Sequence, residues 1–469
     1  MKKIELNHPI FQKVKEAAAI LQLDTYVVGG FVRDQILGRE SKDIDFVCVG
    51  SGIELAHQVA ALISPKLKVN FFKNYGTAQF VWEGWELEFV GARKESYRKD
   101  SRNPLVEEGT LSDDQNRRDF TVNALAASVN EEDFGQVIDP FTGLEDLEKG
   151  ILQTPLNPDI TFSDDPLRML RAIRFATQLN FTIADDTFEA IKRNAHRIEI
   201  ISQERITTEL NKIILAKTPS LGFKLLDEVG LLPFIFKELS DLKGVDYVKK
   251  QGHKDNFYHT LQVLDNLSQN TDDLWLRWSA ILHDIGKPKS KRFEEGNGWT
   301  FHGHEVIGER MTKTIFKRMR MPLNQELKYV QKLVRMHLRP IPIARDEISD
   351  SAIRRLLFDA GDDIDDLMLL CEADITSKNE EKVKRILKNF RAVRVKLKEI
   401  EEKDHIRNFE PPVSGELIME TFGLKPCREV GAIKNQIKEA ILEGEIINNI
   451  EEAKVLMLKL GKDLGLKTK

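Results

Sequence analysis

The sequence predicts an α+β protein: a mixed β-sheet with helices fills about the first 150 residues, and helices make up the rest. Short β-branched and aromatic runs bounded by glycine are frequent before Pro158 and rare after it. Beyond Pro158, apolar residues recur at helical spacing almost throughout. The chain has 469 residues, 41% hydrophobic and 31% charged, a composition typical of a folded protein. This length predicts about three domains.

The first part of the chain is expected to contain five strands. Residues 25–28 form a short apolar run that ends at Gly29-Gly30. Residues 43–47 alternate polar and apolar side chains, as a half-buried strand does. The other strands are expected over residues 67–72, 77–82 and 85–90, and helices over residues 10–21 and 31–37.

The segment over residues 94–117 is polar, contains Gly109 and has few apolar side chains. We interpret it as a long mobile loop. Loops of this length inside a compact domain are often functional.

The second part of the chain is expected to be helical. We expect four domains, over residues 1–150, 151–240, 241–380 and 381–469. The expected helices cover residues 167–179, 186–195, 203–215, 257–267, 274–283, 305–319, 327–336 and 382–402, together with much of the last 40 residues.

Charge and cysteine usage exclude several classes of protein. No apolar run approaches the roughly 18 residues of a membrane span, and the N-terminal residues lack the pattern of a secretory signal. The three cysteines are widely spaced and form neither a disulfide framework nor a thiolate metal site, which is typical of a reducing cytoplasm. The net charge of −5 means that a nucleic acid would have to bind local basic patches.

Two stretches are strongly basic. Residues 310–339 contain nine Lys or Arg residues against Glu326 alone, and residues 378–398 contain nine against Glu380 and Glu381. A helix with such an excess is able to follow a phosphate backbone. The alternative is an ordinary solvated helix face, which we favour for either stretch taken alone.

Asp43 and Asp45 are two residues apart on an expected strand, so their side chains share one face. Two carboxylates at this distance repel each other unless a cation lies between them. Pairs of this kind hold Mg²⁺ for phosphoryl or nucleotidyl transfer. Turns and solvated faces also produce Asp-x-Asp, so the pattern is weak on its own.

Gly29 and Gly30 strengthen this interpretation. Glycine lets backbone N–H groups approach a phosphate, a helix N-terminus favours anions, and Arg33 lies near the start of the expected helix. The stretch over residues 28–45 resembles the first motif of the class II tRNA nucleotidyltransferase and bacterial poly(A) polymerase family. Four further stretches resemble the family's other motifs in the same order, at residues 117–125, 139–147, 164–175 and 204–214.

The resemblance implies a nucleotidyltransferase (polymerase β-like) head with a mixed sheet, followed by a helical neck, body and tail. Asp43 and Asp45 would hold two Mg²⁺ ions, with Glu88 as a candidate third carboxylate on a neighbouring strand. Glu88 is otherwise an ordinary strand charge. The resemblance places phosphates and the incoming nucleotide at Gly29, Gly30, Arg33, Arg118, Asp119 and Asn123, with Arg171 and Arg174 continuing the base-selecting helix.

Asp165 and Arg168 lie three residues apart at an expected helix start, on one face. Cytosine and adenine both present an amino donor beside a ring-nitrogen acceptor. A carboxylate and a guanidinium complement that order and leave unpaired groups against uracil or guanine. In the family, the matching pair selects the base. The alternative is that Asp165, which precedes Pro166, caps the helix.

Histidines and aspartates cluster in the helical part. His283-Asp284 ends an apolar helix, and five of the ten histidines fall between residues 259 and 337. Imidazole and carboxylate together suit divalent cations. The pattern resembles the HD phosphohydrolase superfamily, which implies a divalent metal of unknown identity and metal-assisted hydrolysis of a phosphate ester. The alternative is a structural helical module. The implied ligands are His259, His283, Asp284, His304, His337 and Asp374, with Asp362 to Asp366 as competitors for the last position.

The sequence therefore predicts an enzyme that adds CCA to the 3′ end of tRNA from CTP and ATP, with Mg²⁺ and without a nucleic-acid template. No association with a membrane is expected. A second phosphohydrolase activity is expected from the HD-type domain. The family alternatives are an A-adding enzyme, a CC-adding enzyme and a poly(A) polymerase. The alternative from another class is an HD phosphohydrolase whose head only grips RNA.

Overall fold

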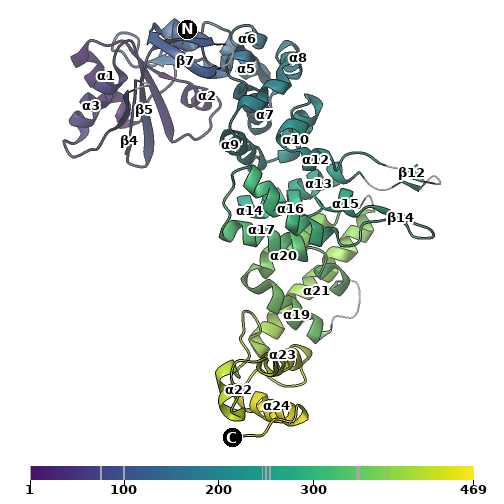
Figure 1. Ribbon diagram of the computed structural model, residues 1–469. Helices are drawn as coiled ribbons and strands as arrows, with labels where there is room; N and C mark the ends of the chain where they lie inside the picture. The colour runs from purple at the N-terminus through teal and green to yellow at the C-terminus, as the bar shows by residue number, and fades with distance from the viewer. Residues whose placement is uncertain are drawn as a thin grey trace. The chain divides into compact units, whose positions relative to one another are not determined.

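The computed structural model describes residues 2–73, 76–98, 101–245, 247–248, 251–252, 255–344, 349–377 and 379–469. The chain forms two compact units, Met1–Lys237 and Glu238–Lys469, which are described separately below (Figure 1). The first unit contains a mixed sheet and helices, and the second is almost wholly helical. The predicted α+β class is confirmed.

The first unit is built on a seven-stranded sheet of order β3-β4-β5-β2-β1-β8-β9. Strands β2 and β5 are parallel, and the other neighbours are antiparallel, so the sheet is mixed. The five predicted strands are confirmed, although β3 is shorter than predicted. The strands are β1 (Thr25–Val28), β2 (Asp43–Cys48), β3 (Asn70–Phe72), β4 (Thr77–Trp82), β5 (Trp85–Gly91), β8 (Ala126–Ser128) and β9 (Val137–Ile138).

The two faces of the sheet differ in character. Ile44 and Phe46 of β2 and Leu87 and Phe89 of β5 are buried, and helices α1 (Pro9–Leu21) and α3 (Gly52–Ile63) pack together beside this part of the fold. The Phe46 and Phe89 rings stack with centroids 5.0 Å apart. Because side chains alternate along a strand, Asp43, Asp45 and Glu88 point to the other face.

Helix α2 (Gly30–Ile36) follows β1 through a tight turn at Gly29, whose φ is +75°. The positive φ of Gly29 strains any larger residue there, whose Cβ would also lie 2.9 Å from Arg118 Nη1 and force that guanidinium to shift. The turn therefore places the start of α2 beside Arg118.

Residues 94–117, which we predicted to be a loop, are ordered into secondary structure. Strands β6 (Arg93–Arg98) and β7 (Ser101–Glu108) pair antiparallel as a separate ribbon, and helix α4 (Leu111–Asn116) follows. Residues 99–100 lie outside the described residues. Thr110 and Asp113 form a reciprocal capping box at the start of α4. The loop prediction was wrong because it relied on the scarcity of apolar side chains. A two-stranded ribbon is held by hydrogen bonds between backbones and does not require an apolar face.

The rest of the first unit is a helical layer that begins with the long helix α7 (Leu167–Leu179) and its neighbour α9 (Gln203–Ile214). Both were predicted to within one residue. The remaining elements are η2 (Thr121–Asn123), α5 (Gly143–Lys149), β10 (Ile151–Leu152), α6 (Pro158–Asp164), β11 (Thr182–Ile183), α8 (Asp185–Asn194), η3 (Ala195–Ile200), α10 (Pro219–Glu228) and α11 (Leu232–Ile235). Helix α12 (Lys237–Ser240) begins at the last residue of the first unit and continues into the second.

The second unit packs its helices around buried apolar side chains, which include Trp278, Phe257, Phe316 and Phe390. Its elements are β12 (Tyr247–Val248), β13 (Gln251–Gly252), α13 (Asn256–Ser268), α14 (Leu274–Leu282), α15 (Lys287–Ser290), β14 (Arg292–Glu294), β15 (Gly298–Thr300), α16 (His304–Arg318), α17 (Gln325–Met336), α18 (Pro340–Ile343), α19 (Asp350–Ala360), η4 (Gly361–Asp363), α20 (Ile364–Asp374), α21 (Glu380–Asp404), α22 (Gly415–Phe422), α23 (Arg428–Glu443) and α24 (Ile450–Asp463).

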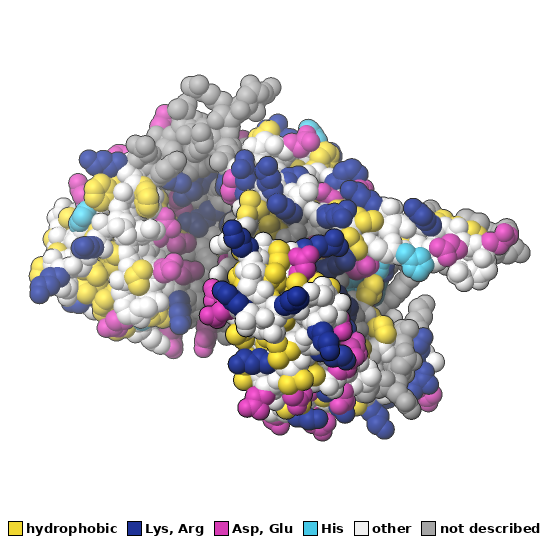
Figure 2. All heavy atoms as spheres, turned by 60° about the horizontal axis from the view of Figure 1, so that its bottom comes forward, with side chains coloured by type: hydrophobic (Ala, Val, Ile, Leu, Met, Phe, Trp, Pro, Cys, Tyr) yellow, Lys and Arg dark blue, Asp and Glu magenta, His cyan; other side chains and the backbone are white. Residues whose placement is uncertain are grey.

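Many cations of the two basic stretches pair with acids from elsewhere in the second unit. Lys332 pairs with Asp363, and Arg394 pairs with Glu372 at 2.8 Å. Arg318 and Arg339 also have carboxylate partners. Figure 2 likewise shows Lys and Arg side chains interspersed with Asp and Glu on the visible face of the molecule. The pairing agrees with the solvated-face interpretation. Among the described residues, none of the helices has the length and apolar character needed to cross a bilayer.

Candidate active site

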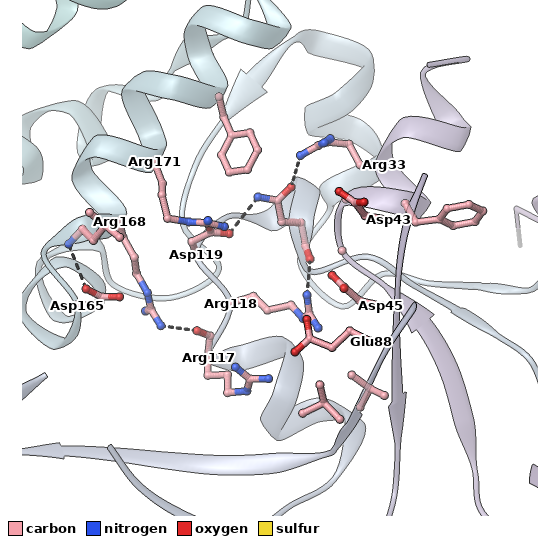
Figure 3. Close-up of a pocket in the computed structure, with 18 of the residues that line it drawn as sticks. Arg33, Asp43, Asp45, Glu88, Arg117, Arg118, Asp119, Asp165, Arg168 and Arg171 are labelled. Atoms are coloured by element: carbon pink, nitrogen blue, oxygen red, sulfur yellow. Dashed lines mark hydrogen bonds and ion pairs between the residues drawn. The ribbon is translucent and has the colours of Figure 1, made fainter. Parts of the chain in front are cut away.

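A pocket of about 580 Å³ lies on the open face of the sheet in the first unit. Carboxylates from β2 and β5 form one wall of the pocket. Arginines from α2, from the segment directly after α4 and from α7 form the other wall (Figure 3). All thirteen residues predicted for nucleotidyl transfer line this pocket: Gly29, Gly30, Arg33, Asp43, Asp45, Glu88, Arg118, Asp119, Asn123, Asp165, Arg168, Arg171 and Arg174.

The three carboxylates are aligned by the sheet register. Asp45 of β2 pairs with Glu88 of β5, and Asp43 is two residues before Asp45 on the same face. Burial raises the pKa of Asp45, and the negative charge of Asp43 raises it further. Burial and the charge of Asp45 likewise raise the pKa of Glu88. Ionisation of Asp45 and Glu88 is therefore less favourable than that of a free carboxyl group.

These residues fit a divalent cation. Hard cations prefer carboxylate oxygens, and a cation between Asp43 and Asp45 would relieve the repulsion that raises the pKa of Asp45. Arg118 supplies the nearest compensating charge, but its guanidinium is held by Asp114, to which Nε donates at 2.9 Å. The site thus keeps a demand for positive charge that a bound metal ion meets.

A chain of hydrogen bonds joins α7 to α2 across the pocket. Arg171 Nε donates to Asp119 Oδ2 at 2.6 Å, and Asn123 Nδ2 donates to Asp119 Oδ1 at 3.0 Å. Arg33 Nη1 then donates to Asn123 Oδ1 at 2.7 Å. Burial raises the pKa of Asp119, but Arg171 and the Asn123 amide outweigh burial and hold that pKa at about 2. Asp119 therefore acts as a permanently charged anchor.

Sequence reasoning missed two residues of this wall. Asp114 is fully buried and pairs with both Arg117 and Arg118. The spacing of i, i+3 and i+4 on a helix was the available signal. The Phe175 ring lies 3.8 Å from the guanidinium carbon of Arg174, 5.0 Å from that of Arg33 and 5.3 Å from that of Arg171. Three guanidinium groups thus lie close to one aromatic ring.

Asp165 and Arg168 both reach the pocket, but each also makes a local contact. Asp165 Oδ1 accepts from the backbone N–H of Leu167 at 3.1 Å, so the capping alternative is real. Asp165 Oδ2 lies 3.5 Å from Arg205 Nη2. Arg168 Nη2 donates to the carbonyl oxygen of Arg117 at 2.6 Å. Capping therefore uses Oδ1 of Asp165 and leaves Oδ2 directed toward the partly exposed guanidinium of Arg205.

The second unit contains a separate cluster in which all six predicted ligands meet. His259 Nε2 lies 2.9 Å from Asp374 Oδ1, which favours Asp374 over the acids at residues 362–366. His283 Nε2 lies 3.2 Å from Asp284 Oδ2, and His304 Nε2 lies 3.2 Å from Asp284 Oδ1. Two groups with ligand atoms within 4.8 Å of one another result: His259, His283 and Asp284, and Asp284, His304 and His337.

Backbone carbonyl groups orient three of the imidazole rings through their Nδ1 atoms. Nδ1 of His283 lies 2.7 Å from the carbonyl oxygen of Ala280, and Nδ1 of His304 and of His337 lie 2.7 Å from those of Phe301 and Val334. A carbonyl only accepts, so Nδ1 carries the proton and Nε2 presents its lone pair to the cluster. Burial and the nearby His283 lower the pKa of His337 to about 4, which keeps that ring neutral.

This cluster also fits a divalent metal. Among the described residues, His283 Nε2 is buried and makes no hydrogen bond of good geometry, although it lies 3.2 Å from Asp284 Oδ2 and its ring is fixed by Ala280. Ligand atoms of His259, His283, His304 and His337 gather around Asp284, which is common to both groups. Sequence reasoning missed Lys287, whose ammonium contacts Asp284 Oδ2, and Thr376, whose hydroxyl lies 2.8 Å from His259 Nδ1.

Replacing Asp119 with asparagine is expected to destabilise the chain in a pH-dependent way. The folded-state pKa of about 2 lies below the ordinary value of 3.8, so the carboxylate contributes about 2 kcal/mol at neutral pH. That contribution is complete above about pH 4 and is lost as the pH falls through 2. The difference in free energy of urea unfolding between wild type and Asp119→Asn should shrink by about 1 kcal/mol from pH 7 to pH 3. A difference in free energy of unfolding that does not change with pH would contradict this expectation. The control variant is Asp186→Asn, at an exposed position in the first turn of α8.

Replacing Asp284 with asparagine is expected to abolish divalent-metal binding in the second unit, because Asp284 belongs to both ligand groups. Metal content after dialysis against Zn²⁺ or Mn²⁺ and removal of free ions, measured by mass spectrometry, provides the test. The matched control is His302→Asn, whose side chain is 83% exposed and lies outside the cluster. Equal metal content in wild type and Asp284→Asn would show that the cluster does not bind these ions.

Comparisons with known proteins agree with this geometry. Residues 25–153 match the family model described as "Poly A polymerase head domain", residues 180–243 match "Probable RNA and SrmB- binding site of polymerase A", and residues 256–379 match "HD domain". The first match spans Asp43, Asp45 and Glu88 with Arg33 and Arg118, but not the arginines of α7, and the third spans the histidine cluster.

Two curated relatives and one solved structure are similar over most of this chain. A Multifunctional CCA protein of Nitrosococcus oceani is 30% identical over 370 residues, which are 76% of this chain and 86% of that protein. An A-adding tRNA nucleotidyltransferase of Aquifex aeolicus is 30% identical over 388 residues, which are 81% of this chain but 42% of that protein. A tRNA nucleotidyltransferase complexed with a primer tRNA and an incoming ATP analog is 25% identical with a TM-score of 0.58, covering 81% of this chain and 99% of that structure. The chain belongs to the tRNA nucleotidyltransferase family that has the poly(A) polymerase head domain.

Proposed function

We propose that this protein completes the 3′ end of tRNA by adding CCA from CTP and ATP. The observation that carries this proposal is the single pocket in which a carboxylate cluster faces an arginine wall, with Asp165 and Arg168 at its edge. The names of the two relatives, Multifunctional CCA protein and A-adding tRNA nucleotidyltransferase, support tRNA as the substrate and the addition of CCA residues. The proposal includes the four predicted domains, with the nucleotidyltransferase head over residues 1–150 and the neck over residues 151–240.

The reaction joins the 3′-oxygen of the RNA to the α-phosphorus of the nucleotide. The bond from that phosphorus to the bridging oxygen breaks, and pyrophosphate leaves with the electron pair. The hydroxyl proton passes to the carboxylate cluster, in which burial raises the pKa of Glu88 and makes it a stronger base.

The arginine wall binds the triphosphate. Arg33, Arg171 and Arg174 are held around Phe175, and Arg118 is held by Asp114, so their positions are set before the nucleotide arrives. Fixed cations stabilise the charge that develops on the leaving pyrophosphate without reorganising. The backbone at Gly29 and Gly30 allows a phosphate to approach the start of α2.

Asp43 and Asp45 hold Mg²⁺ in this proposal, with Glu88 beside them. The ion supplies charge neutralisation at the phosphates and a lowered pKa for a coordinated hydroxyl. The sheet register keeps the three carboxylates within reach of one another, so the protein provides a rigid ligand set.

Base selection belongs to Asp165 and Arg168. A carboxylate accepts from the amino group of cytosine or adenine, and a guanidinium donates to the adjacent ring nitrogen. Asp165 is able to do this while capping α7, because its Oδ1 takes the N–H of Leu167 and its Oδ2 faces Arg205. Uracil and guanine would leave both groups unpaired.

The second unit is proposed to hydrolyse phosphate esters with a divalent metal held by His259, His283, Asp284, His304, His337 and Asp374. The metal supplies Lewis acidity and an activated water. The preset Nε2 lone pairs are the support for this role, and residues 241–380 form the corresponding domain.

The A-adding alternative is favoured by one observation, the Aquifex aeolicus relative, which carries that name. The two activities differ only in the substrates that are extended. They are therefore separated by the first assay below.

Single-nucleotide extension tests the main proposal. Transcripts that lack CCA, CA or A are incubated with Mg²⁺ and CTP, ATP or both, and we expect all three to be completed to CCA and then to stop. Asp45→Asn should lower the rate by at least 10²-fold because it removes a buried ligand, whereas the control Glu40→Gln, outside the pocket, should stay within twofold. Extension of the A-lacking transcript alone would identify an A-adding enzyme, and no extension would refute the proposal.

Asp165→Asn isolates base selection from capping. Asparagine caps a helix as well as aspartate does, so the melting temperature should stay close to that of wild type. The ratio of kcat/KM for CTP to that for UTP should fall at least tenfold, because the amide offers a donor toward the base where the carboxylate offered an acceptor. An unchanged ratio would restrict Asp165 to the capping role.

A further inference from the structure

His259 differs from the other three clustered histidines in the group that its Nδ1 faces. In those three rings, Nδ1 lies 2.7 Å from the backbone carbonyl oxygen of the residue three positions earlier. Nδ1 of His259 instead lies 2.8 Å from the hydroxyl oxygen of Thr376, which is 117 positions later in the chain. A carbonyl only accepts a hydrogen bond, whereas a hydroxyl both donates and accepts. Thr376 therefore does not fix the proton of the ring on Nδ1.

The other nitrogen of the His259 ring faces two carboxylates. Nε2 lies 2.9 Å from Asp374 Oδ1 and 3.5 Å from Asp284 Oδ2. Because a carboxylate oxygen only accepts, these neighbours draw the proton of the neutral ring to Nε2 when no metal ion is bound. Nδ1 then accepts a hydrogen bond from the hydroxyl of Thr376. His259 thus favours the tautomer opposite to the one that the backbone carbonyls impose on the other three rings.

The contacts of His259 are fixed by packing between α13 and the end of α20. Asn266 lies seven residues after His259 on the same face of α13, and its Nδ2 donates to the carbonyl oxygen of Ala373 at 3.0 Å. The backbone N–H of Thr376 donates to the carbonyl oxygen of Asp374 at 2.7 Å, which closes a tight turn. One short segment therefore places a carboxylate at Nε2 and a hydroxyl at Nδ1 of the same ring.

A divalent cation held by Nε2 of His259 requires the lone pair of that nitrogen. The proton on Nε2 then leaves to water and Nδ1 takes a proton from water, so the ring stays neutral and no net proton is released. Nδ1 now donates to the hydroxyl oxygen of Thr376, and the hydroxyl turns about its C–O bond to accept. A backbone carbonyl in this place would serve the second form of the ring alone, whereas a hydroxyl serves both.

We propose that Thr376 is a positioning residue for metal binding in the second unit, because its hydroxyl bonds Nδ1 of His259 in either tautomer of the ring. This inference rests on the proposed function, since it concerns the metal of the phosphohydrolase site. It makes His259 the ligand that has to rearrange, whereas carbonyls preset the rings of His304 and His337. Without the hydroxyl, the Nδ1 proton of the metal-bound ring would lack its acceptor, and outer partners of this kind contribute about 10- to 100-fold to metal affinity.

The affinity for Zn²⁺, measured on the full chain by competition with a chromophoric chelator, tests this role. Thr376→Val keeps the shape of the side chain and removes the hydroxyl, so it should weaken Zn²⁺ binding by about tenfold or more. Thr376→Ser keeps the hydroxyl, so its affinity should stay close to that of wild type. The matched control is Thr314→Val, at an exposed position of α16 outside the cluster, which should leave the affinity unchanged.

Nitrogen-15 NMR of the histidine rings adds a readout that a merely structural role would not change. In the chelator-treated chain, the His259 ring, identified by its loss in His259→Gln, should carry its proton on Nε2. After addition of Zn²⁺ that proton should be on Nδ1. The His337 ring, whose Nδ1 faces the carbonyl of Val334, should keep its proton on Nδ1 in both samples. A His259 ring that carries a proton on Nδ1 before Zn²⁺ is added would overturn the inference.

The affinities separate the inference from the proposed function. Wild-type affinity in Thr376→Val would overturn the inference and leave the metal site standing. Equal weakening in Thr376→Ser and Thr376→Val would also overturn it, because the hydroxyl would then not be the group that matters. Absence of Zn²⁺ binding by wild type would refute the proposed metal role, and the inference would fall with it. Incorporation of CTP into tRNA should stay at the wild-type rate in every threonine variant, because that pocket lies in the first unit.

Discussion

The buried pairing of Arg171 with Asp119 is the interaction on which the arrangement of the first unit depends. Asp119 is charged and buried, and it accepts hydrogen bonds from Arg171 and from the side-chain amide of Asn123. The amide oxygen of Asn123 in turn accepts a hydrogen bond from Arg33. This chain of hydrogen bonds ties helix α7 to the start of α2. Removing one member would leave a buried charge unpaired, which is costly, so the network favours one arrangement of the pocket.

The sheet supplies the second constraint, because its two faces do different work. Phe46 and Phe89 stack on the buried face, which fixes the register between β2 and β5. A register shift of one residue would carry Asp45 to the buried face and an apolar side chain to the pocket. The apolar packing on one side therefore maintains the carboxylate cluster on the other, and neither can change alone.

Much of this organisation was predictable from the sequence, and the rest depended on contacts between distant segments. Strands β1 and β4 and helix α7 follow local periodicity, so their bounds were found almost to the residue. The ribbon of β6 and β7 was not found, because a polar two-stranded ribbon has no apolar period. Asp114 and Phe175 were missed as site residues, since their roles come from arginines gathered by the fold. The six residues proposed as metal ligands could be singled out because their residue types are distinctive, whereas the carbonyls that orient three of their rings leave no trace in the sequence.

Asp165 shows why capping and base selection need not exclude each other. A carboxylate has two oxygens, and the backbone at the start of α7 uses only Oδ1. That bond fixes the orientation of the group, so Oδ2 is presented in a defined direction without the loss of rotamer freedom that a mobile side chain would suffer on binding. In the proposed function the cap then contributes to base selectivity, because an acceptor held rigidly discriminates between donor and acceptor edges of a base more strongly than one that can turn away. The same argument applies to the imidazoles of the second unit, whose Nδ1 bonds leave Nε2 directed at the cluster.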